Sequence, residues 1–364
     1  MTLLRAIALL LAAVVPVAAQ ADIVFGVALP RSGSVAAIGD QILNGVTAAA
    51  KDLNDRGGIN GQKLVLDVLD DACDPKTAVN VANRFTAAGI KLIVGHMCSG
   101  ASIVASEVYA ENGALMISPA SNAAKLTDRG LPGIFRVCGR DDEQGVYTAK
   151  VFTERFKGRK VAILHDNAPF GRGLAEAVKA NLNKVGIQEE IFAAVTPGER
   201  DYTAVISRLK AAGIEVAYYG GYPQEMGALV KQSAEQAYRA QWFTGSGVAS
   251  REFVAVGGPA TDGVLMTFNP DPRKKPEAAA IVDGFKARGI DPEGFTLYGY
   301  AAVQALSQAA AKSQSTDPKV LEKTLKSERF STLLGDVAFD AKGDISAPGY
   351  VLYVWKDGRF DYAP

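Results

Sequence analysis

The residues best placed to bind a ligand are small hydroxyl and amide side chains at two consecutive strand-to-helix junctions. Ser99 follows a short apolar run and opens a helical segment, so its hydroxyl and the first free N–H groups of the helix can meet an anion. After the next apolar run come Ala120, Ser121 and Asn122, whose backbone donors and side chains suit a carboxylate. One such junction is ordinarily an N-cap. Two neighbouring junctions favour a carboxylate-binding site.

Patterns for catalysis or metal binding are weak elsewhere in the chain. The two histidines, His96 and His165, each follow an apolar run, and a polar residue at a strand end is the simpler interpretation than a pair of bases. Gly171 and Gly173 open a helix after a strand, but Glu176 occupies the place of the third glycine of a dinucleotide-binding turn. No nucleophile elbow and no metal-ligand spacing occurs. We therefore expect a binding protein without cofactor or metal, not an enzyme.

A repeated order of strand, turn and helix positions these residues. The first series contains four apolar runs separated by helical segments, and a second series begins near residue 142; the runs are 23–29, 64–69, 92–94 and 114–117, then 160–165, 190–194 and 214–219. Apolar runs without a period of two, separated by helices, are typical of parallel strands. The pattern predicts an α/β protein with two doubly wound parallel-sheet lobes, with binding sites at the carboxyl ends of the strands.

The remaining sequence indicates that the chain crosses between the lobes more than once. A polar, proline-bearing segment follows residue 269, then long helices, and the chain ends in strand-like runs. The simplest account returns the chain to the first lobe and crosses again near the end, which would make a hinge. The expected N-terminal lobe is 22–140 plus 270–345, and the C-terminal lobe is 141–269 plus 346–364.

Residues 1–21 have the pattern of a secretory signal peptide. Arg5 supplies the positive start, an unbroken apolar stretch follows, and Ala19-Gln20-Ala21 matches a cleavage site. We expect an exported, soluble protein, because no later apolar run reaches the roughly 20 residues that span a bilayer. The 364 residues contain 39 Lys+Arg and 39 Asp+Glu, a balance that argues against a nucleic-acid binder.

Export makes the cysteines interpretable, since exported proteins can hold disulfides. Cys73 and Cys98 both follow strand-like runs, and adjacent parallel strands would bring these ends together. We infer a Cys73–Cys98 disulfide, worth about 3 kcal/mol from the entropy of loop closure. Cys138 lies in a short apolar run and is expected to be a buried free thiol.

Several motifs resemble those of the periplasmic leucine/isoleucine/valine-binding proteins, the ligand receptors of ABC importers. The resemblance covers essentially the whole chain after the signal peptide, and it is specific only in combination. The motifs are Asp70-Asp71-Ala72-Cys73-Asp74-Pro75-Lys76, Val94-Gly95-His96-Met97-Cys98-Ser99, Met116-Ile117-Ser118-Pro119-Ala120, Leu164-His165-Asp166, Tyr218-Tyr219-Gly220-Gly221-Tyr222 and Phe339-Asp340-Ala341-Lys342-Gly343-Asp344.

The resemblance implies a clamshell of the type I periplasmic binding protein fold, with a three-segment hinge that closes on the ligand. It also implies the Cys73–Cys98 bridge and a periplasmic location. In the family, residues matching Ser99 and Ala120 hold the ligand carboxylate, and a threonine stands where this chain has Asn122. The residue matching Met97 touches the ligand side chain, and aromatic residues close over it at positions matching Phe170, Tyr222 and Phe295.

The chain departs from the family where the ligand ammonium binds. The family's glutamate position falls at Ser246, and two cleft tyrosines are replaced by Ile38 and Phe170. A buried ammonium needs a charged or multi-acceptor partner, so these changes favour a non-amino carboxylate, such as an aromatic acid or an aromatic or branched 2-keto acid. The resemblance alone favours branched-chain amino acids. Another acid in the cleft, for example Glu225 or Asp142, could replace the lost glutamate.

The expected role is therefore delivery of a small carboxylate to an inner-membrane ABC permease, by a monomer. A periplasmic sensory receptor of the same fold is an alternative, since its lobes would look alike in sequence. An exported enzyme is a third, but no histidine lies near a candidate nucleophile in a known spacing.

Overall fold

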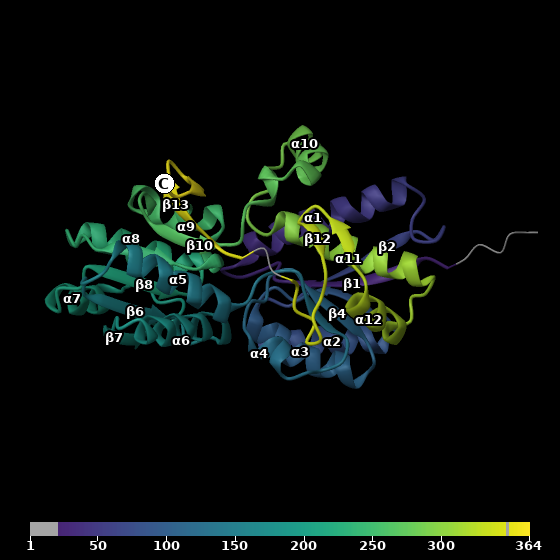
Figure 1. Ribbon diagram of the computed structural model, residues 1–364, viewed down its shortest axis with the longest axis horizontal. Coiled ribbons are helices and arrows are strands. Elements are labelled where there is room, and N and C mark those ends of the chain that lie inside the picture. Colours follow the sequence, from purple (N-terminus) through teal and green to yellow (C-terminus); the bar gives the residue numbers. More distant parts are fainter. Residues whose placement is uncertain (1–20, 347–348) are drawn as a thin grey trace, which may run out of the picture.

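The computed structural model describes residues 21–346 and 349–364, so nearly all of the predicted signal peptide lies outside the described residues (Figure 1). The first lobe is built on a parallel five-stranded sheet of order β2-β1-β3-β4-β5. Its strands are β1 (Ile23–Leu29), β2 (Leu64–Asp70), β3 (Leu92–Gly95), β4 (Leu115–Ser118) and β5 (Ile134–Arg136).

The second lobe is built on a seven-stranded sheet of order β14-β13-β10-β9-β8-β6-β7. Five strands run parallel, and the two C-terminal strands join antiparallel at one edge, beside β10. The strands are β6 (Val161–His165), β7 (Glu189–Ala194), β8 (Val216–Gly220), β9 (Gln241–Thr244), β10 (Leu265–Phe268), β13 (Val351–Lys356) and β14 (Arg359–Tyr362). The prediction of two doubly wound lobes is confirmed.

Helices follow most strands, as the repeated pattern predicts. The first series contains α1 (Ala36–Asp55), α2 (Pro75–Ala87), α3 (Ser99–Glu111) and α4 (Lys125–Asp128). The second contains α5 (Asp141–Arg155), α6 (Pro169–Lys184), α7 (Thr203–Ala211), α8 (Pro223–Glu235), η1 (Ser246–Val248), α9 (Arg251–Gly257) and η2 (Gly258–Thr261). The returning segment contains η3 (Pro272–Lys274), η4 (Pro276–Ala278), α10 (Ala279–Ala287), α11 (Thr296–Ser313), α12 (Pro318–Ser327) and the hairpin β11 (Phe330–Thr332) and β12 (Gly335–Val337).

The returning chain is joined to the first lobe by a close crossing of α1 and α11 (Figure 1). At Gly45 a Cβ atom would lie 1.8 Å from the carbonyl oxygen of Thr296, and at Gly299 one would lie 2.5 Å from that of Ile42. Both helices lack a side chain where their backbones touch. This packing places Phe295, the residue before α11, beside the first lobe's sheet ends.

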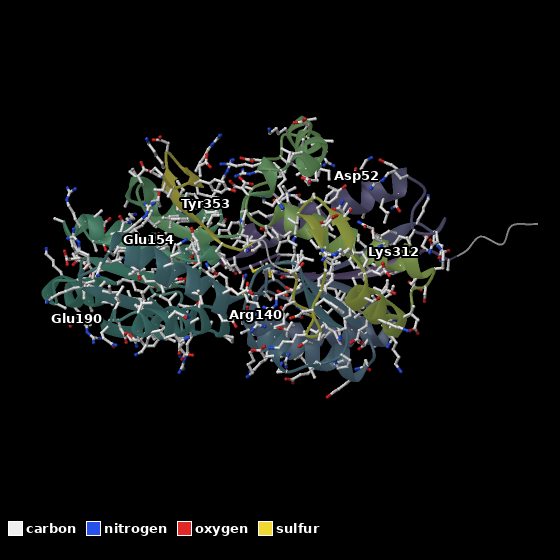
Figure 2. All side chains as sticks on the ribbon, viewed as in Figure 1. Asp52, Arg140, Glu154, Glu190, Lys312 and Tyr353 are labelled. Carbon is white, nitrogen blue, oxygen red and sulfur yellow. A yellow bond between two sulfur atoms is a disulfide. The ribbon has the colours of Figure 1, made fainter. Side chains whose placement is uncertain are left out.

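Three crossings connect the lobes, and Asn269 holds them together. The amide of Gly139, in the first crossing, donates to Asn269 Oδ1 at 3.4 Å, and Asn269 Nδ2 donates to the carbonyl of Gly349 in the third at 2.9 Å. The Tyr350 hydroxyl donates to the carbonyl of Arg140 at 2.9 Å. Arg140 lies at the junction of the lobes (Figure 2). We propose that the lobe boundaries fall at these crossings.

Ionic contacts anchor the first crossing to the first lobe. Arg140 pairs with Asp344 at 2.7 Å, and the buried guanidinium of Arg136 pairs with the other carboxylate oxygen of Asp344 at 2.6 Å. Arg140 also pairs with Asp142 at the start of α5 at 2.8 Å. The motif around Asp344 therefore fixes the base of the hinge.

Gly45→Ala should lower the free energy of unfolding by about 2–3 kcal/mol, the scale of overpacking a tight contact, because the new methyl meets the Thr296 carbonyl. Gly284→Ala is the control: it lies in α10 with nothing within 4 Å of the added carbon, and should stabilise by about 0.5–1 kcal/mol. Urea unfolding measures both. Equal effects would contradict a close α1–α11 contact.

The cysteines give a second test. The structure has a Cys73–Cys98 disulfide and a buried free Cys138, as the sequence predicts. Thiol titration of denatured, unreduced protein should therefore find one thiol per chain, and three after reduction. Three thiols before reduction would show that the disulfide does not form.

Candidate functional site

A small cavity lies between the two lobes, at the carboxyl ends of strands from both sheets. The first lobe contributes residues from α1, from the junctions after β3 and β4, and from the start of α11. The second contributes residues from α6, α8 and η1. The lining residues are Ile38, Met97, Ser99, Ala120, Asn122, Phe170, Tyr222, Gly247 and Phe295.

Eight of the ten ligand-binding residues predicted from sequence line this one cavity. Gly247 is an additional lining residue, whereas the predicted residues Ser121 and Ser246 do not line the cavity. Both serines are buried, but their hydroxyls bond within the protein. The structure thus brings together the carboxylate-binding candidates Ser99, Ala120 and Asn122 with the predicted aromatic wall.

The first-lobe wall offers neutral donors. Ser99 is the first residue of α3, whose N-terminus has no capping side chain and no acidic residue in its first turn. The Ser99 hydroxyl oxygen accepts from the amide of Ala123 at 3.2 Å, which leaves its proton free to donate. A helix N-terminus with free N–H groups attracts an anion. This end of the cavity can therefore bind a carboxylate.

The His96 carbonyl explains why Ser121 faces away from the cavity. Hydroxyl groups of Ser118, Ser102 and Ser121 donate to this oxygen at 2.7, 3.2 and 3.1 Å. These bonds join the junction after β4 to the junction after β3. Ser121 therefore positions the segments that carry Ser99 and Ala120, and does not itself meet a ligand.

The His96 ring is also engaged inside the first lobe. Its Nδ1 lies 2.6 Å from Asp71 Oδ2 and its Nε2 lies 2.9 Å from the Tyr109 hydroxyl, and all three side chains are buried. Asp71 follows β2, so the bond joins the ends of β2 and β3 close to the disulfide. His96 is a satisfied polar residue at a strand end, the simpler of its two interpretations.

The second-lobe wall is aromatic. The rings of Phe170 and Tyr222 lie 5.3 Å apart, and a Cβ atom at Gly247 would lie 2.5 Å from the Phe170 ring. A glycine at position 247 therefore lets η1 approach the aromatic pair. Burial raises the pKa of the Tyr222 hydroxyl well above its usual value, and the charges of Asp166 and Asp141 raise it further.

Ser246 lies behind this wall. Its hydroxyl donates to Gln144 Oε1 at 3.4 Å, and Gln144 Nε2 donates to the carbonyl of Thr267 at 2.8 Å. In this structure the Ser246 hydroxyl therefore faces Gln144, and the expectation that it meets the ligand in place of a glutamate stays a prediction. That hydroxyl already donates to the side-chain amide oxygen of Gln144.

Asp141 is the functional candidate that the sequence reading missed. It is the first residue of α5, 2% exposed, and neither carboxylate oxygen has a hydrogen-bond partner among the described residues. Its amide donates at 2.9 Å to the carbonyl of Asn122, a lining residue, and its side chain lines a second interlobe cavity beside Ala123 and Pro169. Burial raises the Asp141 pKa well above its usual value, although Arg136 acts in the opposite direction.

The two acids named from sequence are engaged elsewhere. Asp142 is half exposed and pairs with Arg140, whereas Glu225 is buried and accepts from the amide of Gly198 at 3.0 Å. Asp166, behind Tyr222, accepts from the amide of Ala168 at 2.9 Å. Burial raises the Asp166 pKa to about 7, with a further contribution from Glu225. Asp141 alone of these four carboxylates combines burial with the lack of a partner.

No group of three or more His, Cys, Asp or Glu side chains within 21–346 and 349–364 is arranged to hold a metal ion. Over the same residues, no helix combines the length and apolar character needed to cross a membrane.

Comparison with known proteins identifies the family to which this chain belongs. A model of the family described as periplasmic binding protein matches residues 22–359. Leu/Ile/Val-binding protein homolog 1 of Brucella suis is 45% identical over 348 residues, 94% of each chain, and an amino acid binding protein of Pseudomonas aeruginosa is 44% identical over 350 residues, 95% of this chain and 94% of that one. The crystal structure of the leucine binding protein LivK from Thermotoga maritima superposes with a TM-score of 0.87 at 25% identity, covering 94% of this chain and 98% of that one. With two doubly wound lobes, three crossings and a cavity between them, the chain belongs to the periplasmic binding protein family.

Proposed function

We propose that this protein is the periplasmic substrate-binding component of an ABC importer and that it captures a branched-chain amino acid between its lobes. The names of the relatives support this ligand class, since the Brucella protein is called Leu/Ile/Val-binding and the Pseudomonas protein amino acid binding. The sequence-based preference for aromatic or 2-keto acids rested on Ser246. We do not propose those acids as the ligand, because the Ser246 hydroxyl faces Gln144.

The observation that carries the proposal is the buried, unpartnered carboxylate of Asp141. A carboxylate in this state costs free energy unless a positive or donating group meets it. A ligand ammonium would supply both charge and hydrogen-bond donors. A 2-keto acid, in contrast, would present a neutral carbonyl oxygen in place of the ammonium, and this oxygen offers neither positive charge nor a donor to the Asp141 carboxylate.

The opposite end of the ligand would meet neutral groups. Ser99, the free N–H groups of α3 and the Ala120–Asn122 junction supply donors for the ligand carboxylate. Neutral donors for the carboxylate, together with the Asp141 acid in the adjoining interlobe cavity for the ammonium, would give the cleft a polarity that suits a zwitterion. This polarity distinguishes a free amino acid from a simple acid or amine.

The apolar part of the ligand would lie against Ile38, Met97, Phe170 and Phe295, all of them cavity-lining residues. Each is buried, so their faces toward the cavity are shielded from water. The space left between these walls is small, so the lobes enclose the site closely. An aliphatic side chain of three or four carbons matches walls that offer hydrophobic contact and few polar groups.

This assignment makes the protein a carrier, not an enzyme. It would bind the ligand in the periplasm as a monomer and present it to an inner-membrane permease. The permease would recognise the closed lobes, since closure is the change that ligand binding produces in such two-lobed proteins.

Asp141→Asn should weaken leucine binding by about 1.5–3 kcal/mol, the usual scale for a hydrogen bond to a charged group. At pH values above the raised pKa of Asp141 the same change should stabilise the ligand-free protein, because it removes a buried charge that has no partner among the described residues. Isothermal titration calorimetry with leucine and 2-ketoisocaproate, together with urea unfolding, measures both effects. The unsubstituted protein should prefer leucine.

Glu143→Gln is the matched control, since it makes the same charge change in the same first turn of α5 at an exposed position. It should leave leucine affinity nearly unchanged. Tight binding of the keto acid with no binding of leucine would overturn the proposed ligand class. Equal losses in both variants would show that only the general charge of the cleft matters.

The raised pKa of Asp141 also predicts proton release on binding. In the ligand-free protein burial favours the protonated carboxyl, whereas a bound ammonium favours the carboxylate and lowers its pKa. At pH values below the ligand-free pKa, leucine binding should therefore release a proton, and affinity should rise as the pH rises through that pKa. Calorimetry in two buffers of different ionisation enthalpy detects the proton. Release that persists in Asp141→Asn would assign it to another group.

A further inference from the structure

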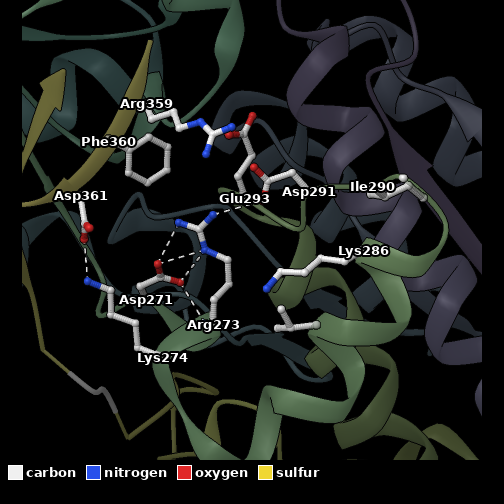
Figure 3. Close-up of a pocket in the computed structure, with 12 residues that line it drawn as sticks. Asp271, Arg273, Lys274, Lys286, Ile290, Asp291, Glu293, Arg359, Phe360 and Asp361 are labelled. Carbon is white, nitrogen blue, oxygen red and sulfur yellow. Dashed lines mark hydrogen bonds and ion pairs between the residues drawn. The ribbon is translucent and has the colours of Figure 1, made fainter. Parts of the chain in front are cut away.

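The second lobe touches the first outside the ligand cavity through Arg251, at the start of α9. Its guanidinium lies 2.9 Å from Asp291 and 3.2 Å from Glu293. These acids lie in the loop between α10 and α11, just before the cavity-lining Phe295. Figure 3 shows both carboxylates at the wall of a larger cavity formed by η3, α10 and β14, away from the ligand site. The contact thus joins the lobes at one rim of the cleft.

A second contact lies beside the first. Gln41, in α1 of the first lobe, donates through Nε2 to the carbonyl of Ala249 in the second lobe at 3.1 Å. Its Oε1 accepts from the amide of Phe295 at 3.1 Å. Ala249 is two residues from Arg251 and two residues from Gly247 of the cavity wall. One short second-lobe segment, residues 247–251, therefore reaches both the cavity and the rim contact.

Neither Arg251 nor its acidic partners line the ligand cavity. Their contact joins the two lobes as they lie in this structure, and no ligand takes part in it. In a protein that binds by closing, the apparent dissociation constant depends on how favourable the closed state is as well as on direct contacts. An interlobe contact of this kind changes affinity for every ligand by the same factor.

We propose that Arg251, Asp291 and Glu293, together with Gln41, form a latch that sets the lifetime of the closed lobes without touching the ligand. This inference rests on the proposed function, because the lifetime of the closed state is read from the release of bound amino acid. The latch lies on the rim where α9 faces the loop before α11. It acts mainly on ligand release, since the contact must break before the lobes open.

The exposure of the residues limits the size of the effect. The Arg251 side chain is 57% exposed, whereas Glu293 is 13% exposed. Exposed ion pairs have small effects that salt weakens. Removing the Arg251 charge should therefore speed leucine release about two- to fivefold, with little change in the association rate, and the difference from the unsubstituted protein should shrink at high salt.

Stopped-flow release of leucine from Arg251→Gln, Glu293→Gln and the double variant tests the latch. The double variant should release leucine no faster than Arg251→Gln, because that substitution already removes the pair with Glu293 as well as the pair with Asp291. Arg159→Gln is the control: Arg159 is 59% exposed and pairs with Glu215 within the second lobe. Its release rate should match that of the unsubstituted protein.

Urea unfolding without ligand gives a second test that does not require leucine binding. It compares the unsubstituted protein with the two single variants and the double variant. A coupling between the Arg251 and Glu293 substitutions shows that the rim contact exists. If leucine fails to bind the unsubstituted protein, the proposed function fails, and this coupling alone decides the latch. Release rates equal to that of Arg159→Gln would overturn the latch, as would additive effects in the double variant or, where leucine does not bind, no coupling in unfolding.

Discussion

Asn269 is the residue on which the two-lobed arrangement depends. Its side chain joins the first and third crossings through Gly139 and Gly349, and its carbonyl accepts from the Tyr353 hydroxyl at 2.7 Å. The side chain of Asn122 then donates to the carbonyl of Gly139 at 2.8 Å. Because Asn122 also lines the cavity, a single hydrogen bond connects the ligand site with the crossings about which the lobes would move. Ligand contact and lobe position are therefore coupled through neighbouring backbone groups.

The sequence predicted the fold and most of the cavity wall because both follow from local patterns. Apolar runs separated by helices define parallel strands, and the carboxyl ends of such strands must meet at one edge. Ser99, Ala120 and Asn122 immediately follow predicted strands, so the topology alone brings them together. Phe170, Tyr222 and Phe295 come from distant segments, and it was the resemblance to a family that placed them in one cleft.

The sequence could not show the direction in which a side chain points. Ser121 stands between two lining residues, yet its hydroxyl donates to the carbonyls of His96 and Met97, because an unpartnered buried carbonyl there would be costly. Ser246 adjoins the lining Gly247, but Gln144 uses its hydroxyl. The sequence does not mark Asp141 as a binding residue, because an acid at the start of a helix is ordinarily a surface residue that interacts favourably with the helix dipole. The structure shows that the crossing between the lobes buries this carboxylate and that it has no hydrogen-bond partner among the described residues.

These three residues show how a binding cleft differs from a folded core. At Ser121 and Ser246 the protein satisfies its buried polar groups internally, which stabilises the lobes and leaves nothing for a ligand. At Asp141 no partner is found among the described residues, and the ligand-free protein bears the cost of an unsatisfied buried carboxyl group. A substitution that supplied Asp141 with a partner would stabilise the protein and remove the reason for an ammonium to bind. The ligand's contribution to closure is thus greatest where the free structure is least satisfied, whereas contacts such as the Arg251 latch act equally on every ligand. If both proposals hold, selectivity and residence time would be controlled by different residues on different parts of the cleft.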